Sequence, residues 1–196
     1  MKSKNLLSLN YKLVLGSKSP RRAEILRNAG LEFVVRTQDV SEDFDETTPV
    51  TDVAEILSVR KANELLLTLT QDELLITADS VVILDGIIYN KPADFDDAVR
   101  ILTLLSGRTH TVVTGVTLIT KDKIHSFSSV SKITFDTLTK EEIHYYIHNY
   151  QPFDKAGAYG IQDWIGLCKV SKIEGSYSNI MGLPMRDLYK ALKFNF

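Results

Sequence analysis

The chain has 196 residues, and its hydrophobic fraction of 44% and charged fraction of 24% are ordinary for a globular domain. A formal net charge of −2 offers no general attraction to nucleic acid, so we expect no nucleic-acid partner and only local positive potential. The single cysteine, Cys168, excludes a disulfide framework and a cysteine-based zinc site.

Near the N-terminus, the apolar run that follows Lys4 is interrupted at Asn10, which is too early for a signal peptide. No run elsewhere approaches the about 18 apolar residues needed to cross a bilayer. We therefore expect a cytoplasmic protein with no membrane partner. Its length fits a single domain, residues 1–196, built as two lobes that share one sheet.

The stretch 16–22 (GSKSPRR) follows a short apolar run, residues 13–15, and contains the start of a helix. Ser19 is a good N-cap, and Pro20 suits the first helical position, where its missing N–H is no loss. The pattern predicts a strand, a tight turn and a helix of about 11 residues that stops at Gly30. Unpaired N–H groups and the helix dipole favour an anion at such a helix start.

Arg21 and Arg22 fall in the first turn of this helix, where the dipole favours acidic residues. Two cations there are unfavourable unless an anion binds, and a guanidinium can grip two oxygens of a phosphate. The alternative is two solvated arginines on a surface helix. Ser17 and Ser19 are not expected to be nucleophiles, because no G-x-S-x-G motif surrounds them.

A strand is predicted over residues 32–37, followed by an acidic loop over 38–49 that includes Glu42. Most carboxylates of this loop are expected to be solvated. A mobile acidic loop near a phosphate site could still supply one metal ligand.

A long helix capped by Thr51 or Asp52 is predicted to reach about residue 68, with four apolar residues inward: Val53, Ile56, Leu57 and Leu65. Arg60 is spaced to pair with Glu64 across one turn. Lys61 lies near the apolar face, so its ammonium group must either reach solvent or find an anion.

Residues 74–78 (LLITA) are typical of a central strand covered on both faces, which we expect to end at Asp79 and Ser80. Asp79 could act as a general base or hold a divalent cation, and the alternative is an aspartate that caps the next turn. A hairpin around Asp85 and Gly86 follows. Lys91 lies at the exit of that hairpin, where taken alone it is a solvated loop lysine.

After the hairpin, the sequence predicts a helix over 94–105 and strands over 111–120 and 124–135. The next helix has a Thr139/Glu142 capping box and is predicted to turn Ile143, Ile147 and Tyr150 inward. A structured loop over 151–166, a strand near 167–173, a loop over 175–182 and a final helix complete the chain. Gln162 lies in the glycine-rich loop, where its amide could read a base edge. His144 and His148 lack the third ligand that a zinc site needs.

Strands and helices alternate at first, and a long antiparallel arm enters in the middle. This order predicts an α/β protein with a mixed, bent central sheet and helices on its outer faces. Ligands of such sheets lie beyond the strand ends, where residues 17–22 and Asp79 would both lie.

Five stretches together resemble the Maf family of nucleoside triphosphate pyrophosphatases: Ser17–Arg22, Ala78–Val82, Asn90–Pro92, Lys155–Gln162 and Gly175–Asn179 with Gly182–Pro184. The resemblance runs in order from residue 13 to residue 192. It implies an inosine-triphosphatase-like fold with a cleft between two lobes, homodimers, and a divalent cation such as Mg, Mn or Co. It also implies hydrolysis of nucleoside triphosphates to the monophosphate and pyrophosphate.

Carried over by motif, Asp79 would be the proton acceptor, with Glu42 and Asp79 as candidate metal ligands. The residues linked to substrate choice would be Arg21, Ser80 and Gln162. The other polar positions of the pocket would be Ser17, Ser19, Arg22, Lys61, Lys91 and Glu42.

The Ser-Pro-Arg-Arg and Tyr-Gly-Ile-Gln motifs resemble the subgroup that acts on dTTP and UTP rather than the branch that acts on 7-methyl-GTP. Ser80 and Asn90 depart from the usual Thr and Gly, so rate or base preference is expected to differ. The rival hypotheses are an interaction protein of septum formation and cell division, with little catalytic role, and a nucleic-acid-binding module. The net charge of −2 opposes the second.

Overall fold

The computed structural model describes Leu7 and residues 9–196, so the expectation about a signal peptide, which begins at Lys4, lies partly outside the described residues. The strands are β1 (Lys12–Leu15), β2 (Phe33–Val35), β3 (Glu73–Leu84), β4 (Ile87–Tyr89), β5 (Thr109–Ile119), β6 (Ile124–Phe135) and β7 (Val170–Glu174). The helices are α1 (Pro20–Asn28), α2 (Val53–Leu66), α3 (Phe95–Leu105), α4 (Lys140–Tyr150), α5 (Trp164–Cys168), α6 (Tyr177–Ile180) and α7 (Met185–Asn195), with 3-10 turns η1 (Pro152–Asp154) and η2 (Ala156–Ala158).

The strands form a seven-stranded sheet in the order β2-β1-β3-β5-β6-β7, with β4 paired to β3. β1 is parallel to β2 and β3, whereas β4 is antiparallel to β3 and β7 to β6. The predicted mixed α/β class with flanking helices is therefore confirmed, and the predicted bend stays a prediction. None of the described helices is long and apolar enough to cross a membrane.

The chain divides into two compact units, which are described separately. Unit 1 comprises residues 1–79, 114–129 and 182–196, and unit 2 comprises residues 80–113 and 130–181. The chain passes between the units inside β3, β5 and β6 and once more between Met181 and Gly182. The prediction of one domain with two lobes stays a prediction.

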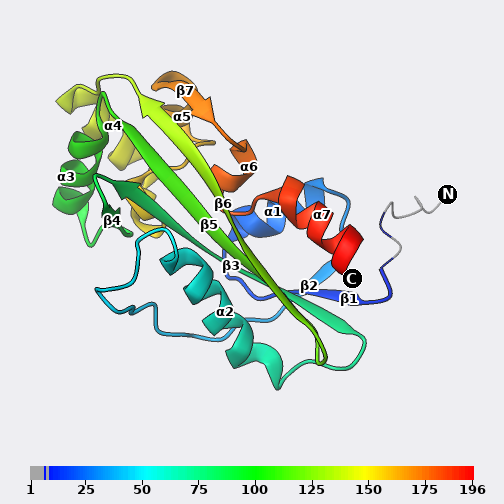
Figure 1. Cartoon of the computed structure of the whole chain (residues 1–196). Coiled ribbons are helices and arrows are strands. Elements are labelled where there is room, and N and C mark those ends of the chain that lie inside the picture. Colours follow the sequence, from blue (N-terminus) through cyan, green and yellow to red (C-terminus); the bar gives the residue numbers. More distant parts are fainter. Residues whose placement is uncertain (1–6, 8) are drawn as a thin grey trace. The chain divides into compact units, whose positions relative to one another are not determined.

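In unit 1, Figure 1 shows α2 on one side of the strands and α1 with α7 on the other. Apolar side chains of α2, of the segment after it and of the strands form a small core: Val14, Ala62, Leu65, Leu69, Leu75 and Ile119. Ile56, predicted to face inward, is 42% exposed. The buried face of α2 includes Val53, Leu57 and Leu65 but not Ile56. Helix α1 starts at Pro20 with Ser19 as its N-cap, as predicted.

β3 continues through Asp79 and Ser80 to Leu84, so the prediction that this strand ends at Asp79 is wrong. The residues after Ser80 pair with β4 through the hairpin, and this ladder keeps the backbone extended. Asp79 nevertheless lies beyond the end of β1, because Leu15 pairs with Ile76 and the Gly16 N–H donates to the Ile76 carbonyl at 2.8 Å.

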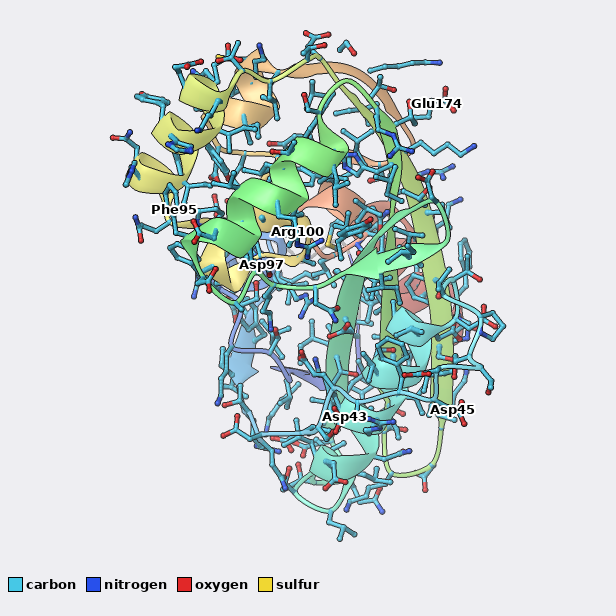
Figure 2. All side chains as sticks on the ribbon, turned by 90° about the vertical axis from the view of Figure 1, so that its left-hand side faces the viewer. Asp43, Asp45, Phe95, Asp97, Arg100 and Glu174 are labelled. Carbon is cyan, nitrogen blue, oxygen red and sulfur yellow. The ribbon has the colours of Figure 1, made fainter. Side chains whose placement is uncertain are left out.

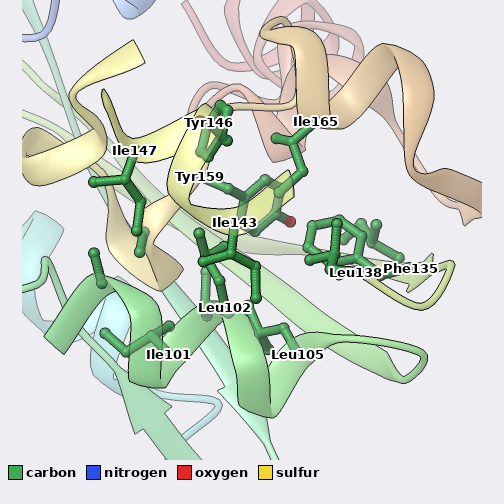
Figure 3. Close-up of a cluster of buried hydrophobic side chains, with 14 of the residues drawn as sticks. Ile101, Leu102, Leu105, Phe135, Leu138, Ile143, Tyr146, Ile147, Tyr159 and Ile165 are labelled. Carbon is green, nitrogen blue, oxygen red and sulfur yellow. The ribbon is translucent and has the colours of Figure 1, made fainter. Parts of the chain in front are cut away.

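In unit 2, α3 and α4 enclose the larger core with the loop that follows α4 (Figure 3). The capping box of Thr139 and Glu142 is present, as predicted. Tyr150, predicted to face inward, is 37% exposed because α4 ends there, whereas Tyr146 is fully buried. The two short helices α5 and α6 were not predicted, since neither is long enough to show a helical period.

Candidate active site

The helix start predicted to bind an anion is built by a close approach of backbone and sheet. Gly16 follows β1 directly, and a Cβ there would lie 2.7 Å from Thr77 Cγ2, so a side chain does not fit without a shift of Thr77. The Ser19 hydroxyl accepts the Arg22 N–H at 3.5 Å and begins the helix. The turn therefore delivers Arg21 and Arg22 to the first turn of α1.

The Arg22 guanidinium is held in place by hydrogen bonds within unit 1. Its Nε donates to the Gly182 carbonyl at 2.8 Å, and its Nη1 donates to the Ser17 hydroxyl at 3.2 Å. Burial lowers the pKa of Arg22 and the charge of Arg21 lowers it further, whereas the carboxylates of Asp79 and Glu42 raise it. An arginine remains charged under these influences. The fixed guanidinium is thus within electrostatic reach of the two predicted acidic residues.

Lys61 bridges those two carboxylates. Its Nζ donates to Asp79 Oδ1 at 2.5 Å and to Glu42 Oε1 at 2.7 Å. The side chains of Lys61 and Asp79 are only 17% and 12% exposed. Of the two alternatives for Lys61, the structure shows the contact with an anion, and the anions are protein carboxylates.

Buried polar contacts fix α2 against the sheet and so place Lys61 opposite Asp79. The Ser58 carbonyl accepts the Thr77 hydroxyl at 2.7 Å, two residues before Asp79, and the Ser58 hydroxyl lies 2.7 Å from the Thr117 hydroxyl. Further along β5, a Cβ on Gly115 would lie 2.3 Å from the Glu55 backbone, so glycine is required for this close packing. Ser58 and Glu55 lie on the same helix as Lys61, and Thr77 lies on the same strand as Asp79.

The acidic loop is tied down by the neighbour of Lys61 on α2. Nη1 of Arg60 donates to the carbonyls of Ser41 and Asp43 at 2.9 and 2.6 Å, which places Glu42 between two anchored residues. Figure 2 shows Asp43 and Asp45 beside α2 in this loop. The predicted pairing of Arg60 with Glu64 is wrong, because the guanidinium caps these carbonyl groups instead.

Glu42 and Asp79 are the two carboxylates that could hold a cation beside Lys61. Among the described residues, no group of three or more His, Cys, Asp or Glu side chains is arranged to hold a metal ion. Two carboxylates that converge on one ammonium group still fit Mg²⁺, which is commonly bound through one or two carboxylates together with substrate phosphates.

The rings of His144 and His148 lie against Phe95, with centroids 5.3 and 4.9 Å away.

The three remaining candidates belong to unit 2. Ser80 is half-buried in β3, and Lys91 is exposed at the exit of the hairpin. Gln162 lies in the loop between η2 and α5, and its buried Oε1 has no hydrogen-bond partner among the described residues. A buried amide oxygen in that state is costly without a ligand.

Two parts of this arrangement were missed by sequence reasoning. The Gly182 carbonyl that fixes Arg22 is 160 residues away in the chain, and the buried Tyr146 hydroxyl hydrogen-bonds to the loop of Gln162. Neither contact has a local sequence signal. The only signal in the sequence was that Gly160 and Gly182 lie inside the motifs that resemble the Maf family.

The chain is similar to known proteins over nearly its whole length. Residues 12–194 match the family described as Maf-like protein. A dTTP/UTP pyrophosphatase of Phocaeicola vulgatus is 47% identical over 184 residues, which cover 93% of this chain and 95% of that protein. A dTTP/UTP pyrophosphatase of Flavobacterium psychrophilum is 43% identical over 180 residues, 92% of each chain.

Among solved structures, a nucleoside-triphosphatase / dITP/XTP pyrophosphatase from Mycobacterium abscessus is 15% identical, with a TM-score of 0.44 over 92% of this chain and 93% of that one. A likeness at that level adds nothing on function. The match to the family over nearly the whole chain, with relatives above 40% identity, is decisive: the chain belongs to the family of Maf-like proteins.

Proposed function

We propose that the protein hydrolyses nucleoside triphosphates, with dTTP and UTP as preferred substrates, to the monophosphate and pyrophosphate. One observation carries this proposal: unit 1 places the fixed guanidinium of Arg22 within electrostatic reach of two carboxylates bridged by Lys61. The first group suits phosphate, and the second suits a general base and a cation. The names of the relatives support the same activity.

The proposed reaction adds water across the bond between the α- and β-phosphates. The water oxygen bonds to the α-phosphorus, the bond from this phosphorus to the bridging oxygen breaks, and its electron pair leaves on pyrophosphate. Asp79 accepts the proton that the water loses. Arg21, Arg22, Lys61 and Lys91 are proposed to neutralise the phosphate charge, and the hydroxyls of Ser17 and Ser19 to help orient it.

A divalent cation such as Mg, Mn or Co is proposed to be held by Glu42 and Asp79. When bound, such an ion would polarise the phosphate oxygens. Lys61 keeps the two carboxylates close to each other, and the anchored loop keeps Glu42 in place.

The choice of base is assigned to Arg21, Ser80 and Gln162. The buried, unpartnered Oε1 of Gln162 supports this assignment for the amide, because a ligand that donates a hydrogen bond would satisfy it. The chain is also proposed to form a homodimer, which sedimentation analysis would check.

The test is pyrophosphate release from dTTP and UTP in the presence of Mg²⁺ or Mn²⁺, with the wild type beside Asp79→Asn. Loss of the general base is expected to slow release by about 10²- to 10⁴-fold. The circular dichroism spectrum serves as the control for folding. Full turnover by the folded variant would refute the assigned role of Asp79, and no release by the wild type from any nucleotide would refute the function.

A further inference from the structure

The loop that carries Gln162 is held by Tyr146, a fully buried side chain of α4 that the proposed reaction does not use. Its hydroxyl donates to Asp163 Oδ2 at 2.7 Å and accepts the Gly160 N–H at 2.9 Å. Gly160 lies two residues before Gln162, and Asp163 lies one residue after it. Burial, and then the hydrogen bond to Asp163, raise the pKa of Tyr146, so the hydroxyl keeps its proton at neutral pH.

Asp163 makes this contact in place of a helix-capping hydrogen bond. It is the N-cap of α5, a position at which an aspartate normally caps the helix with its carboxylate. Its side chain makes no capping hydrogen bond here and bonds to Tyr146 instead. The Asp163 carboxylate therefore anchors the loop of Gln162 and does not cap α5.

A second buried hydrogen bond anchors the same loop on the other side. The Tyr159 hydroxyl lies 2.7 Å from His110 Nε2, and both rings pack edge-on against Phe135. Figure 3 shows Tyr146 and Tyr159 within the cluster formed with Phe135 and α3. The backbone around Gln162 is therefore tied to the core from both ends.

The amide of Gln162 is confined as well. A Cβ on Gly160 would lie 3.0 Å from Gln162 Nε2, which puts the amide nitrogen against the Gly160 backbone and leaves Oε1 buried. A freely turning amide can present either a donor or an acceptor, whereas a fixed amide presents one pattern. Uracil and thymine carry an N3–H donor where cytosine carries an N3 acceptor, so a fixed amide that presents its oxygen can tell them apart.

We propose that Tyr146 is a positioning residue that holds Gln162 in one orientation and thereby makes the enzyme prefer uracil and thymine over cytosine. The inference rests on the proposed function and on the assignment of Gln162 to base choice. It adds Tyr146 and Asp163 to the residues that determine specificity.

The test is the ratio of kcat/KM for UTP to that for CTP in Tyr146→Phe. Removing the hydroxyl should lower this ratio about tenfold, the factor that one well-placed hydrogen bond is worth. In a Gln162→Ala background the ratio should already be low, and adding Tyr146→Phe should change it little. A merely structural role would instead lower turnover of both nucleotides equally and leave the ratio as it was.

The matched control is Tyr150→Phe, the same substitution one turn along α4 on a ring that stacks on Tyr146 at 5.2 Å. It should leave the ratio unchanged. If Tyr146→Phe does not fold, Asp163→Ala removes the acceptor and should shift the ratio in the same direction. An unchanged ratio in a folded, active variant overturns the positioning role, whereas a wild type inactive on every nucleotide overturns the proposed function itself.

Discussion

Two groups of side chains with proposed roles, the cluster around Lys61 in unit 1 and the loop of Gln162 in unit 2, are held by different means. In unit 1, Arg22, Glu42, Lys61 and Asp79 are charged and interact through ion pairs and electrostatic attraction. In unit 2, Gln162 is neutral, and neutral hydrogen bonds of buried tyrosines and a glycine hold its loop. Only the Asp163 carboxylate brings a charge to that loop.

The difference matches the two tasks that we propose. Coulomb attraction falls off slowly with distance, so a cluster of charges can bind a triphosphate without one fixed geometry. Hydrogen bonds weaken steeply with distance and angle, so recognition of a base needs a fixed amide. Variants of Arg22, Lys61 and Asp79 should therefore change rate and stability, and variants around Gln162 should change selectivity.

After Asp79→Asn, the largest effect is expected from Arg22→Met. Loss of the fixed guanidinium should lower kcat/KM for every nucleotide by about 100-fold or more, because it removes charge stabilisation in a partly buried site. Arg22→Lys should recover only part of the rate, since an ammonium group cannot reproduce the fork that also bonds to Ser17 and Gly182.

The control for this variant is Arg27→Met, which removes an exposed arginine of α1 that lies over the Phe33 ring. It should leave the rate unchanged. A large change in nucleotide preference in Arg22→Met would break the proposed division between the units.

Lys61→Met should come next, with stability as the main readout. It leaves the buried carboxylate of Asp79 beside the exposed carboxylate of Glu42 and should cost about 2–3 kcal/mol of unfolding free energy by chemical denaturation. Adding Mn²⁺ should raise the melting temperature of this variant more than that of the wild type, because the ion can replace the lost positive charge.

Lys18→Met is the matched control for Lys61→Met. Lys18 also pairs with a carboxylate, Asp39, but the two side chains are 66% and 94% exposed. Its loss should be barely measurable, as for most surface pairs. Equal effects of the two substitutions would contradict the assigned burial of the Lys61 bridge.

The smallest effect is expected at an ion pair outside the site. Arg36 donates two hydrogen bonds to Glu73 at 2.9 and 2.8 Å and lowers the pKa of this carboxyl from 4.5 to about 2. A lowered pKa in the folded state stabilises above pH 4.5, and this stabilisation is lost as the pH falls toward 2. Glu73→Gln should cost about 1 kcal/mol at pH 7, with no change in rate and a vanishing difference near pH 2.

Asp72→Asn provides the comparison, since Asp72 pairs with Lys12 in solvent, with side chains 53% and 77% exposed. It should not measurably change unfolding at pH 7. Denaturation curves of the two variants across pH 2 to 7 make the check, and a pH-independent effect of Glu73→Gln would be inconsistent with the pairing.

Sequence reasoning found the charged group because its signals are local. Two arginines at a helix start violate the dipole preference, and Lys61 on an apolar face demands a partner. Helix caps were predicted for the same reason, as with Ser19 and the Thr139 capping box. The identity of the partners, such as Glu42 for Lys61, needed the fold.

The hydrogen bonds of Tyr146 and Tyr159 that hold the loop of Gln162 could not be predicted, because each joins residues that only the fold brings together. Tyr146 was overlooked because the apolar spacing of its helix favoured Tyr150 for the inner face. The end of β3 was misplaced at Asp79 because a polar residue in an apolar run looks like a boundary. Its pairing with β4 beyond that point overrides the local signal.

The most direct measurement is kcat/KM for UTP and CTP in Asp79→Asn and Gln162→Ala, side by side with the wild type. We expect Asp79→Asn to lower both values together and leave their ratio unchanged, and Gln162→Ala to keep most of the activity toward CTP while the ratio falls. Full turnover by Asp79→Asn, or a ratio that Gln162→Ala does not alter, would contradict the account.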